Sequence, residues 1–143
     1  MLVVDDEPDI LTTVKAYLER SLPDVQVLTA PSGPEALTLL EQEPVDLVMA
    51  DYRMPGMDGL ELLTRIRTRH PGVLRFMFTA YPDVELAMRA ANEGKVLRFF
   101  TKPLEPAQVR DTIIEVLRDR RREMLRQDSF QRAMRLLERV EKK

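Results

Sequence analysis

Acidic side chains follow two apolar runs of this sequence at places where they could act together. Asp5 and Asp6 come directly after residues 2–4, and Asp51 comes directly after residues 47–50. Crowded carboxylates repel one another and are costly to bury unless a cation neutralises them. Magnesium accepts one or two carboxylates together with water and phosphoryl oxygens, which leaves a carboxylate free to form an aspartyl phosphate. The pattern therefore predicts a site for Mg²⁺ and phosphoryl chemistry.

Two further polar side chains end other apolar runs. Thr79 closes residues 73–79, and Lys102 follows residues 96–100. A hydroxyl and an ammonium group can donate hydrogen bonds to phosphoryl oxygens and offset their charge. Ligands of doubly wound sheets bind at the carboxyl ends of the strands, so we expect all of these side chains to converge there.

The elements that position these residues are predicted by alternating patterns. Five short apolar runs alternate with segments of helical period, which is typical of an α/β fold with a parallel sheet. The runs are almost wholly apolar, as expected for strands covered on both faces. The predicted strands are residues 2–4, 25–29, 47–50, 73–79 and 96–100.

Helix signals separate the predicted strands. Ser32 and Glu35 have capping-box spacing, and Asp83 is a suitable N-cap. Glycines in the segment 54–59 suggest a turn with positive φ at Gly56 and Gly59. The predicted helices are residues 8–20, a segment after Ser32, residues 59–70, residues 83–92, and a last segment from 105 that is either one long helix or two in tandem.

Composition excludes several classes of protein. The 143 residues contain no cysteine and one histidine, which rules out disulfides, thiolate metal sites and multi-histidine sites. No apolar run is long enough to span a membrane and no signal peptide opens the chain, so a cytoplasmic protein is expected. Residues 1–117 hold 12 Lys/Arg against 19 Asp/Glu, whereas residues 118–143 hold 10 against 5. The end of the chain is therefore basic.

The chain resembles the receiver domains of bacterial two-component response regulators, which are CheY-like. The matching segments are residues 3–8 (VVDDEP), 46–59 (DLVMADYRMPGMDG), 78–80 (FTA) and 99–103 (FFTKP). The resemblance implies a flavodoxin-like, doubly wound five-stranded parallel sheet in order 2-1-3-4-5, with helices on both faces and an extended last helix. It covers residues 1–118 as a receiver domain and leaves 119–143 as a basic helical extension.

The resemblance also implies a role for each matching residue. Asp51 would accept a phosphoryl group from a sensor histidine kinase or a phosphotransfer protein, with Mg²⁺ as cofactor. The implied magnesium ligands are Asp5, Asp6, Asp51 and the backbone carbonyl of Arg53. The implied contacts to the phosphoryl group come from Thr79, Ala80 and Lys102.

Other family positions concern switching and rate. Phe99 stands at the aromatic switch position, where a phenylalanine lacks the hydroxyl of a tyrosine. The Lys102–Pro103 peptide bond is cis in the family, and Arg53 and Tyr81 occupy positions that set the dephosphorylation rate. Residues 2–4 form a shorter first strand than is usual, so we expect that the chain is clipped or that its true start lies upstream.

Output in this family passes through the fourth helix, the fifth strand and the fifth helix to an output domain or partner. Residues 93–103 resemble receivers joined to cyclic-dinucleotide phosphodiesterases or other signalling enzymes.

Two rival functions have less support from the sequence. An aspartyl-phosphate hydrolase needs an acid/base Asp where this chain has Arg53, and a constitutive scaffold does not need crowded carboxylates. The chain is expected to be a switch module and not an enzyme beyond its own phosphorylation and dephosphorylation.

The basic tail leaves three interpretations open. Phe130, Met134 and Leu137 are spaced by four and three residues, which favours a dimerising coiled coil through the last helix. Interspersed acidic residues make direct nucleic-acid binding less favoured. The third interpretation is a solvated linker helix to an output domain.

Overall fold

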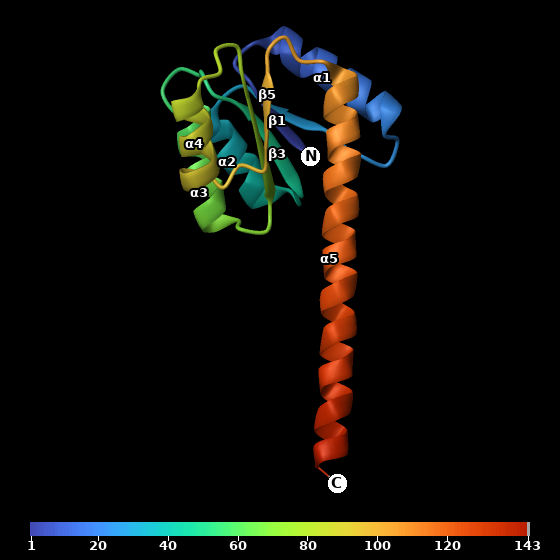
Figure 1. Ribbon diagram of the computed structural model, residues 1–143. Helices are drawn as coiled ribbons and strands as arrows, with labels where there is room; N and C mark the ends of the chain where they lie inside the picture. Colours follow the sequence, from blue (N-terminus) through green and yellow to red (C-terminus); the bar gives the residue numbers. More distant parts are fainter. Residues whose placement is uncertain (143) are drawn as a thin grey trace. The chain divides into compact units, whose positions relative to one another are not determined.

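The first part of the chain folds around one parallel sheet, and the computed structural model describes residues 1–142 (Figure 1). The sheet order is β2-β1-β3-β4-β5, and every neighbouring pair is parallel. This confirms the predicted α/β class and the order 2-1-3-4-5. The strands are β1 (Leu2–Val4), β2 (Leu28–Ala30), β3 (Leu47–Asp51), β4 (Leu74–Thr79) and β5 (Arg98–Thr101).

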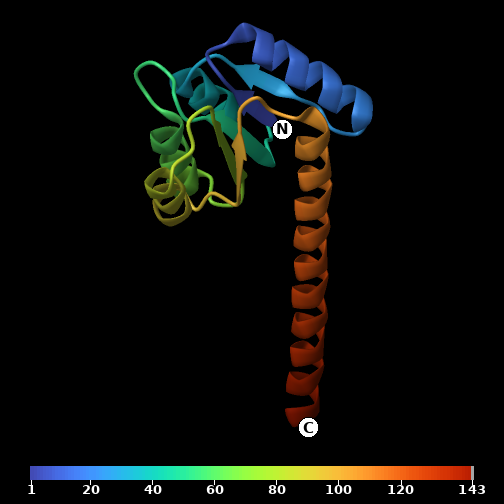
Figure 2. The ribbon, with the colours of Figure 1, turned by 45° about the horizontal axis from the view of Figure 1, so that its top comes forward.

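Helices cover both faces of this sheet. Figure 2 shows the sheet between α1 on one side and the α3–α4 pair on the other. All residues of β1 and β3 are buried, which accounts for their almost wholly apolar sequences. The helices that follow the first four strands are α1 (Pro8–Ser21), α2 (Gly33–Gln42), α3 (Gly59–Arg69) and α4 (Val84–Glu93).

Side-chain caps begin three of these helices. Ser32 Oγ accepts a hydrogen bond from Glu35 N at 3.4 Å, and Asp83 Oδ1 accepts one from Leu86 N at 2.7 Å, as their spacing predicts. Asp58 caps α3 in the same way. Because α3 and α4 start directly after the β3 and β4 loops, these caps fix the backbone close to the strand ends.

The second strand begins later than predicted. Residues 25–29 were expected to form it, but the backbone of Val27 is paired with side chains of α1. Glu19 accepts a hydrogen bond from Val27 N at 3.1 Å, and Lys15 Nζ donates one to Val27 O at 2.6 Å. They satisfy the edge of residue 27 that faces away from β1, whereas pairing with β1 begins at Leu28, opposite Leu2.

The fifth strand also starts later, at Arg98 and not at Val96. Val96 N donates to Ala90 O at 3.1 Å, which completes the end of α4. Lys95 has a φ of 48°, so the chain turns sharply there before it enters the sheet. The apolar run 96–100 therefore begins with a residue that is hydrogen-bonded to α4 and enters the strand only at Arg98.

The last helix, α5 (Pro106–Glu141), is continuous, so the alternative of two helices in tandem is wrong. The chain divides into two compact units, Met1–Pro106 and Ala107–Lys143, and α5 forms nearly all of the second. Its last turns expose Phe130, Leu137 and Val140. No helix among residues 1–142 is both long and apolar enough to cross a membrane.

Candidate functional site

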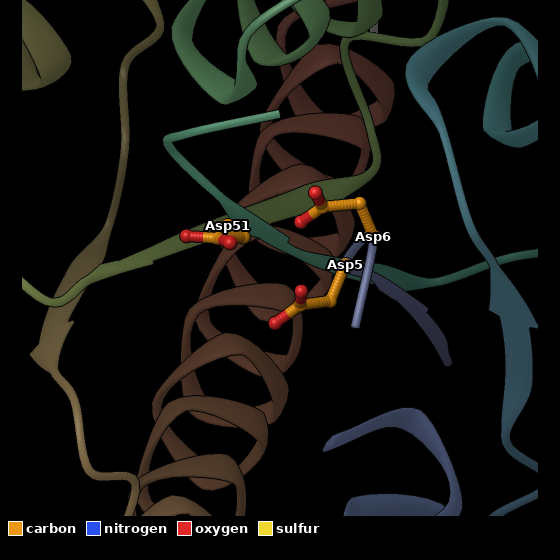
Figure 3. Close-up of side chains that lie close together, drawn as sticks. All are labelled: Asp5, Asp6 and Asp51. Atoms are coloured by element: carbon orange, nitrogen blue, oxygen red, sulfur yellow. The ribbon is translucent and has the colours of Figure 1, made fainter. Parts of the chain in front are cut away.

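Three carboxylates meet where β1 and β3 end. Oxygen atoms of Asp5, Asp6 and Asp51 all lie within 4.8 Å of one another (Figure 3). β1 pairs with β3 in parallel, with Val4 opposite Ala50, so the residue after each strand arrives at the same edge. Asp5 and Asp51 are buried, whereas Asp6 is exposed. The sequence prediction that these three side chains converge is confirmed.

Asp5 supplies the most buried charge of the cluster. Its side chain is 0% exposed, and Oδ1 accepts a hydrogen bond from Glu7 N at 2.9 Å. Its other oxygen, Oδ2, is also buried and forms an ion pair with Lys102 Nζ at 3.2 Å. Burial raises the pKa of Asp5 to about 6, although the hydrogen bond from Glu7 opposes the shift. Together with Asp6 and Asp51, Asp5 offers the hard carboxylate oxygens that Mg²⁺ prefers as ligands.

Lys102 is the cation that already faces these carboxylates. Its Nζ lies 3.0 Å from Asp51 Oδ2, 3.2 Å from Asp5 Oδ2 and 3.5 Å from Glu7 Oε1. Burial lowers the pKa of Lys102, but the hydrogen bonds to Asp51 and Asp5 outweigh it and the pKa is raised. Burial also raises the pKa of Asp51, and Lys102 opposes this only in part. A single ammonium group therefore does not balance the cluster.

Thr79, at the end of β4, and the exposed Ala80 and Tyr81 that follow it border the site. Thr79 is 1% exposed, and its Oγ1 accepts a hydrogen bond from Tyr81 N at 3.3 Å. Ala80 follows it and is exposed. The guanidinium carbon of Arg53 lies 5.0 Å from the centre of the Tyr81 ring. The residues expected at the strand ends thus surround Asp51 on two adjoining loops.

Two other predicted positions lie on β5 or just after it. Phe99 is partly buried and packs against the hydrophobic core. The Lys102–Pro103 peptide bond is cis, and Lys102 N donates to Thr79 O at 2.8 Å. The end of β5 is therefore joined directly to the end of β4.

Gly59 sets the distance between the start of α3 and the end of β3, and the reason for glycine there differs from the positive φ that was expected. Gly56 has the expected positive φ of 77°, but Gly59 is the first residue of α3 and needs no positive φ. A Cβ atom at Gly59 would lie 2.2 Å from the backbone oxygen of Asp51. Glycine is required there because the start of α3 presses against the end of β3. Its position eight residues after a strand-end aspartate was the available signal.

Comparison with known proteins agrees with this geometry. The family model described as the response regulator receiver domain matches residues 1–114. The chain belongs to this family. It is thus a receiver domain of the two-component response regulators, a signalling module with a CheY-like flavodoxin fold.

Relatives with several functions share this domain. The chain is 38% identical to the response regulator PilR of Pseudomonas aeruginosa over 117 residues, and this match covers 82% of the chain and 26% of PilR. It is 33% identical to the cyclic di-GMP phosphodiesterase response regulator RpfG of Xanthomonas campestris over 140 residues, and this match covers 96% of the chain and 37% of RpfG. The chain therefore spans roughly a quarter to a third of these relatives.

Solved structures show the same fold. The signal receiver domain of an HD domain-containing protein from Pseudomonas fluorescens is 33% identical, with a TM-score of 0.77 over 82% of this chain and 93% of that one. A CheY-like receiver domain from Methanospirillum hungatei is 31% identical, with a TM-score of 0.79 over 85% of this chain and 95% of that one.

Proposed function

We propose that Asp51 is the phosphoryl acceptor of this receiver domain and that a sensor histidine kinase or a phosphotransfer protein is the donor. The observation that carries the proposal is the contact of Lys102 Nζ with Asp51 Oδ2 at 3.0 Å, inside a cluster of three carboxylates. Lys102 orients the acceptor and neutralises part of the charge that arrives with a phosphoryl group.

The phosphoryl group passes from a phosphohistidine of the donor to Asp51. A carboxylate oxygen of Asp51 forms a bond to phosphorus, and the bond between nitrogen and phosphorus breaks. The electron pair returns to the imidazole ring of the donor, which takes up a proton. Thr79, already at the end of β4, donates a hydrogen bond from its hydroxyl group to a phosphoryl oxygen once the acyl phosphate has formed.

Asp5, Asp6, Asp51 and the backbone carbonyl of Arg53 would hold Mg²⁺. When bound, Mg²⁺ neutralises the carboxylates and attracts phosphoryl oxygens. The fit rests on the burial of Asp5 and Asp51 and on the single ammonium group, that of Lys102, which faces this cluster of three carboxylates. Hard oxygen ligands of this kind suit Mg²⁺ better than softer metals.

Phosphorylation would reach the output surface through Thr79 and the residues linked to it. Movement of the Thr79 hydroxyl breaks its hydrogen bond with Tyr81 N and shifts the loop that leads into α4. Space then opens for the ring of Phe99, which is only partly buried before the change. Surface residues of α4, among them the exposed Val84 and Met88, change position and alter what this face binds.

The test is incubation of the chain with Mg²⁺ and acetyl phosphate, followed by intact mass spectrometry. We expect the mass of one phosphoryl group to be added only when Mg²⁺ is present. Asp51→Asn should abolish the gain, whereas the matched change Asp24→Asn on the exposed surface should keep it. Equal phosphorylation of Asp51→Asn would contradict the assignment.

We further propose that the tail pairs with a second copy of this chain. Phe130, Met134 and Leu137 lie on one side of α5 and are 65%, 42% and 46% exposed. In light scattering, Phe130→Glu in the full chain should lower the dimer fraction. Leu125→Glu, which changes an exposed apolar residue off this stripe, should not. Equal dimer fractions for the wild type and Phe130→Glu would contradict the pairing.

We also propose that the output domain of the native protein is a cyclic-dinucleotide phosphodiesterase or a related signalling enzyme and not a DNA-binding domain. The similarity to RpfG extends over 140 residues and includes the tail, whereas that to PilR covers 117. The native protein, isolated from cells through this chain, should hydrolyse cyclic di-GMP at a rate that changes with a phosphodonor. No hydrolysis in either state would contradict the proposal.

A cytoplasmic location stays a prediction from the sequence.

A further inference from the structure

The helix α4 makes few buried contacts along its length. Of its ten residues, Leu86 and Ala90 are buried and the others are exposed. Its N-terminal end is capped by Asp83, whose Oδ1 accepts a hydrogen bond from Leu86 N at 2.7 Å. Asp83 belongs to the same stretch of chain, so this cap stabilises the first turn without tying it to another element. The N-terminal end of α4 is therefore free to shift with the loop that precedes it.

The C-terminal end of α4, by contrast, is bound by two arginines from other elements. Arg67 Nη1, on α3, donates hydrogen bonds to Asn92 O at 3.3 Å and to Glu93 O at 3.1 Å. Arg75 Nε, on β4, donates one to Gly94 O at 2.9 Å. The last carbonyl groups of a helix have no partner within the helix, and positive charge is favourable beside them. We call Arg67 and Arg75 the arginine clamp.

Arg75 is itself held in place by several contacts. It is partly buried, and its Nη1 donates a hydrogen bond to Val73 O at 2.6 Å. Its backbone oxygen accepts one from Leu97 N at 2.8 Å, so the chain on both sides of the turn that follows α4 is joined to Arg75. Burial lowers the pKa of Arg75, and the charge of Arg67 lowers it further. The carbonyl oxygens of residues 92–94 offset this repulsion, because each accepts a hydrogen bond from one of the two guanidinium groups.

The two ends of α4 are linked to opposite ends of β4. The N-terminal end follows the loop that leaves β4 at Thr79, where Tyr81 N donates a hydrogen bond to Thr79 Oγ1 at 3.3 Å. Asp51 pairs with Phe78 at this end of the sheet. The C-terminal end is bound to Arg75, the second residue of β4, at the other end of the strand. A shift of the Thr79 hydroxyl therefore reaches the first turn of α4 through the loop and the clamped end only through the helix itself.

We propose that the arginine clamp makes the C-terminal end of α4 a fixed pivot, so that phosphorylation of Asp51 displaces the N-terminal end of the helix and leaves residues 91–97 in place. This inference rests on the proposed function, in which movement of Thr79 shifts the loop before α4. The exposed Val84, in the first turn, then moves furthest, whereas the last turn offers the same surface in both states. A partner that distinguishes the two states contacts the N-terminal half of α4.

Without the clamp, α4 would move as a whole. A helix held only by the side chains of Leu86 and Ala90 can slide or tilt about them, and both of its ends then change together. Backbone hydrogen exchange along residues 80–97 distinguishes the two mechanisms, since it reports the opening of each hydrogen-bonded segment. The amide of Val96, which donates to Ala90 O at 3.1 Å, reports on the clamped end.

The test is hydrogen–deuterium exchange of the full chain with Mg²⁺, in the absence and in the presence of beryllofluoride, a stable mimic of the phosphoryl group. In the wild type, beryllofluoride should change the exchange of residues 80–87 and leave that of residues 91–97 unchanged. In Arg67→Gln, exchange of residues 91–97 should rise about tenfold, the factor expected for loss of a hydrogen bond from a charged donor. The response to beryllofluoride should then extend to these residues. Arg75→Gln should act in the same direction, whereas Arg69→Gln, at the exposed end of α3, is the matched control and should behave like the wild type.

Several results would overturn the pivot. One is an equal response to beryllofluoride in residues 80–87 and 91–97 of the wild type, and another is wild-type exchange of residues 91–97 in Arg67→Gln. A third is faster exchange there while the response to beryllofluoride stays confined to residues 80–87, because the clamp would then only strengthen the helix end. A wild type that responds in no segment would contradict the proposed role of Asp51, and with it the pivot. Faster exchange in Arg67→Gln without beryllofluoride would still show the clamp, so the two failures are distinguishable.

Discussion

Removal of the most buried carboxylate should stabilise the metal-free protein. Asp5 has a pKa of about 6 in the folded chain, against an ordinary value of 3.8. An acid whose pKa is higher in the folded state binds more protons there than in the unfolded state. The free energy of unfolding therefore falls as the pH rises from about 4 through 6, and above that range the full penalty is present.

The size of the effect follows from this shift. Two pH units correspond to about 3 kcal/mol at neutral pH, which is an upper limit for what Asp5→Asn can recover. The amide also loses the 3.2 Å contact with Lys102, so we expect a gain of about 1–2 kcal/mol. In the variant, the decline in stability between about pH 4 and pH 6 should be reduced.

The assay is urea unfolding at a series of pH values, with a chelator and then with millimolar Mg²⁺. Mg²⁺ should stabilise the wild type at neutral pH and should stabilise Asp5→Asn much less, because one ligand is gone. Asp24→Asn, on the exposed surface, controls for the change in net charge. A loss of stability in metal-free Asp5→Asn at neutral pH, or equal stabilisation of both proteins by Mg²⁺, would show that burial of Asp5 does not have the cost expected here.

Three further changes test the contacts that hold the backbone near the strand ends. Gly59→Ala should destabilise the protein by more than about 2 kcal/mol and slow phosphorylation, because its Cβ would lie 2.2 Å from the Asp51 backbone oxygen. Gly33→Ala should cost less, since there the nearest atoms belong to the flexible side chain of Met57. Urea unfolding of both variants decides this, and equal losses would contradict it. Asp83→Ala should cost about 1 kcal/mol through loss of the α4 N-cap, measured in the same way, and an unchanged midpoint would contradict the role of the cap.

The sequence predicted the site well because strand ends are local signals. Asp5, Asp51 and Lys102 each follow an apolar run, and parallel pairing alone brings such positions to one edge of the sheet. The sheet order came from the family resemblance, since the apolar runs by themselves do not say which strands are neighbours.

Long-range pairing limited what the sequence could predict. The late start of β2 follows from its register with β1, in which Leu28 is the partner of Leu2, and no local pattern encodes that register. The need for glycine at Gly59 arises from close approach to Asp51, and this is visible only when α3 and β3 are placed together. The stacking of Arg53 on Tyr81 likewise joins residues 28 positions apart in the sequence.

Phosphorylation of Asp51 can be tested by locating the acyl phosphate in the chain. The protein is incubated with Mg²⁺ and acetyl phosphate, treated with borohydride, which reduces an aspartyl phosphate to homoserine, and then mapped by peptide mass spectrometry. We expect conversion at Asp51 alone, dependent on both Mg²⁺ and the donor. Conversion at Asp5 or Asp6, or none at Asp51, would contradict it.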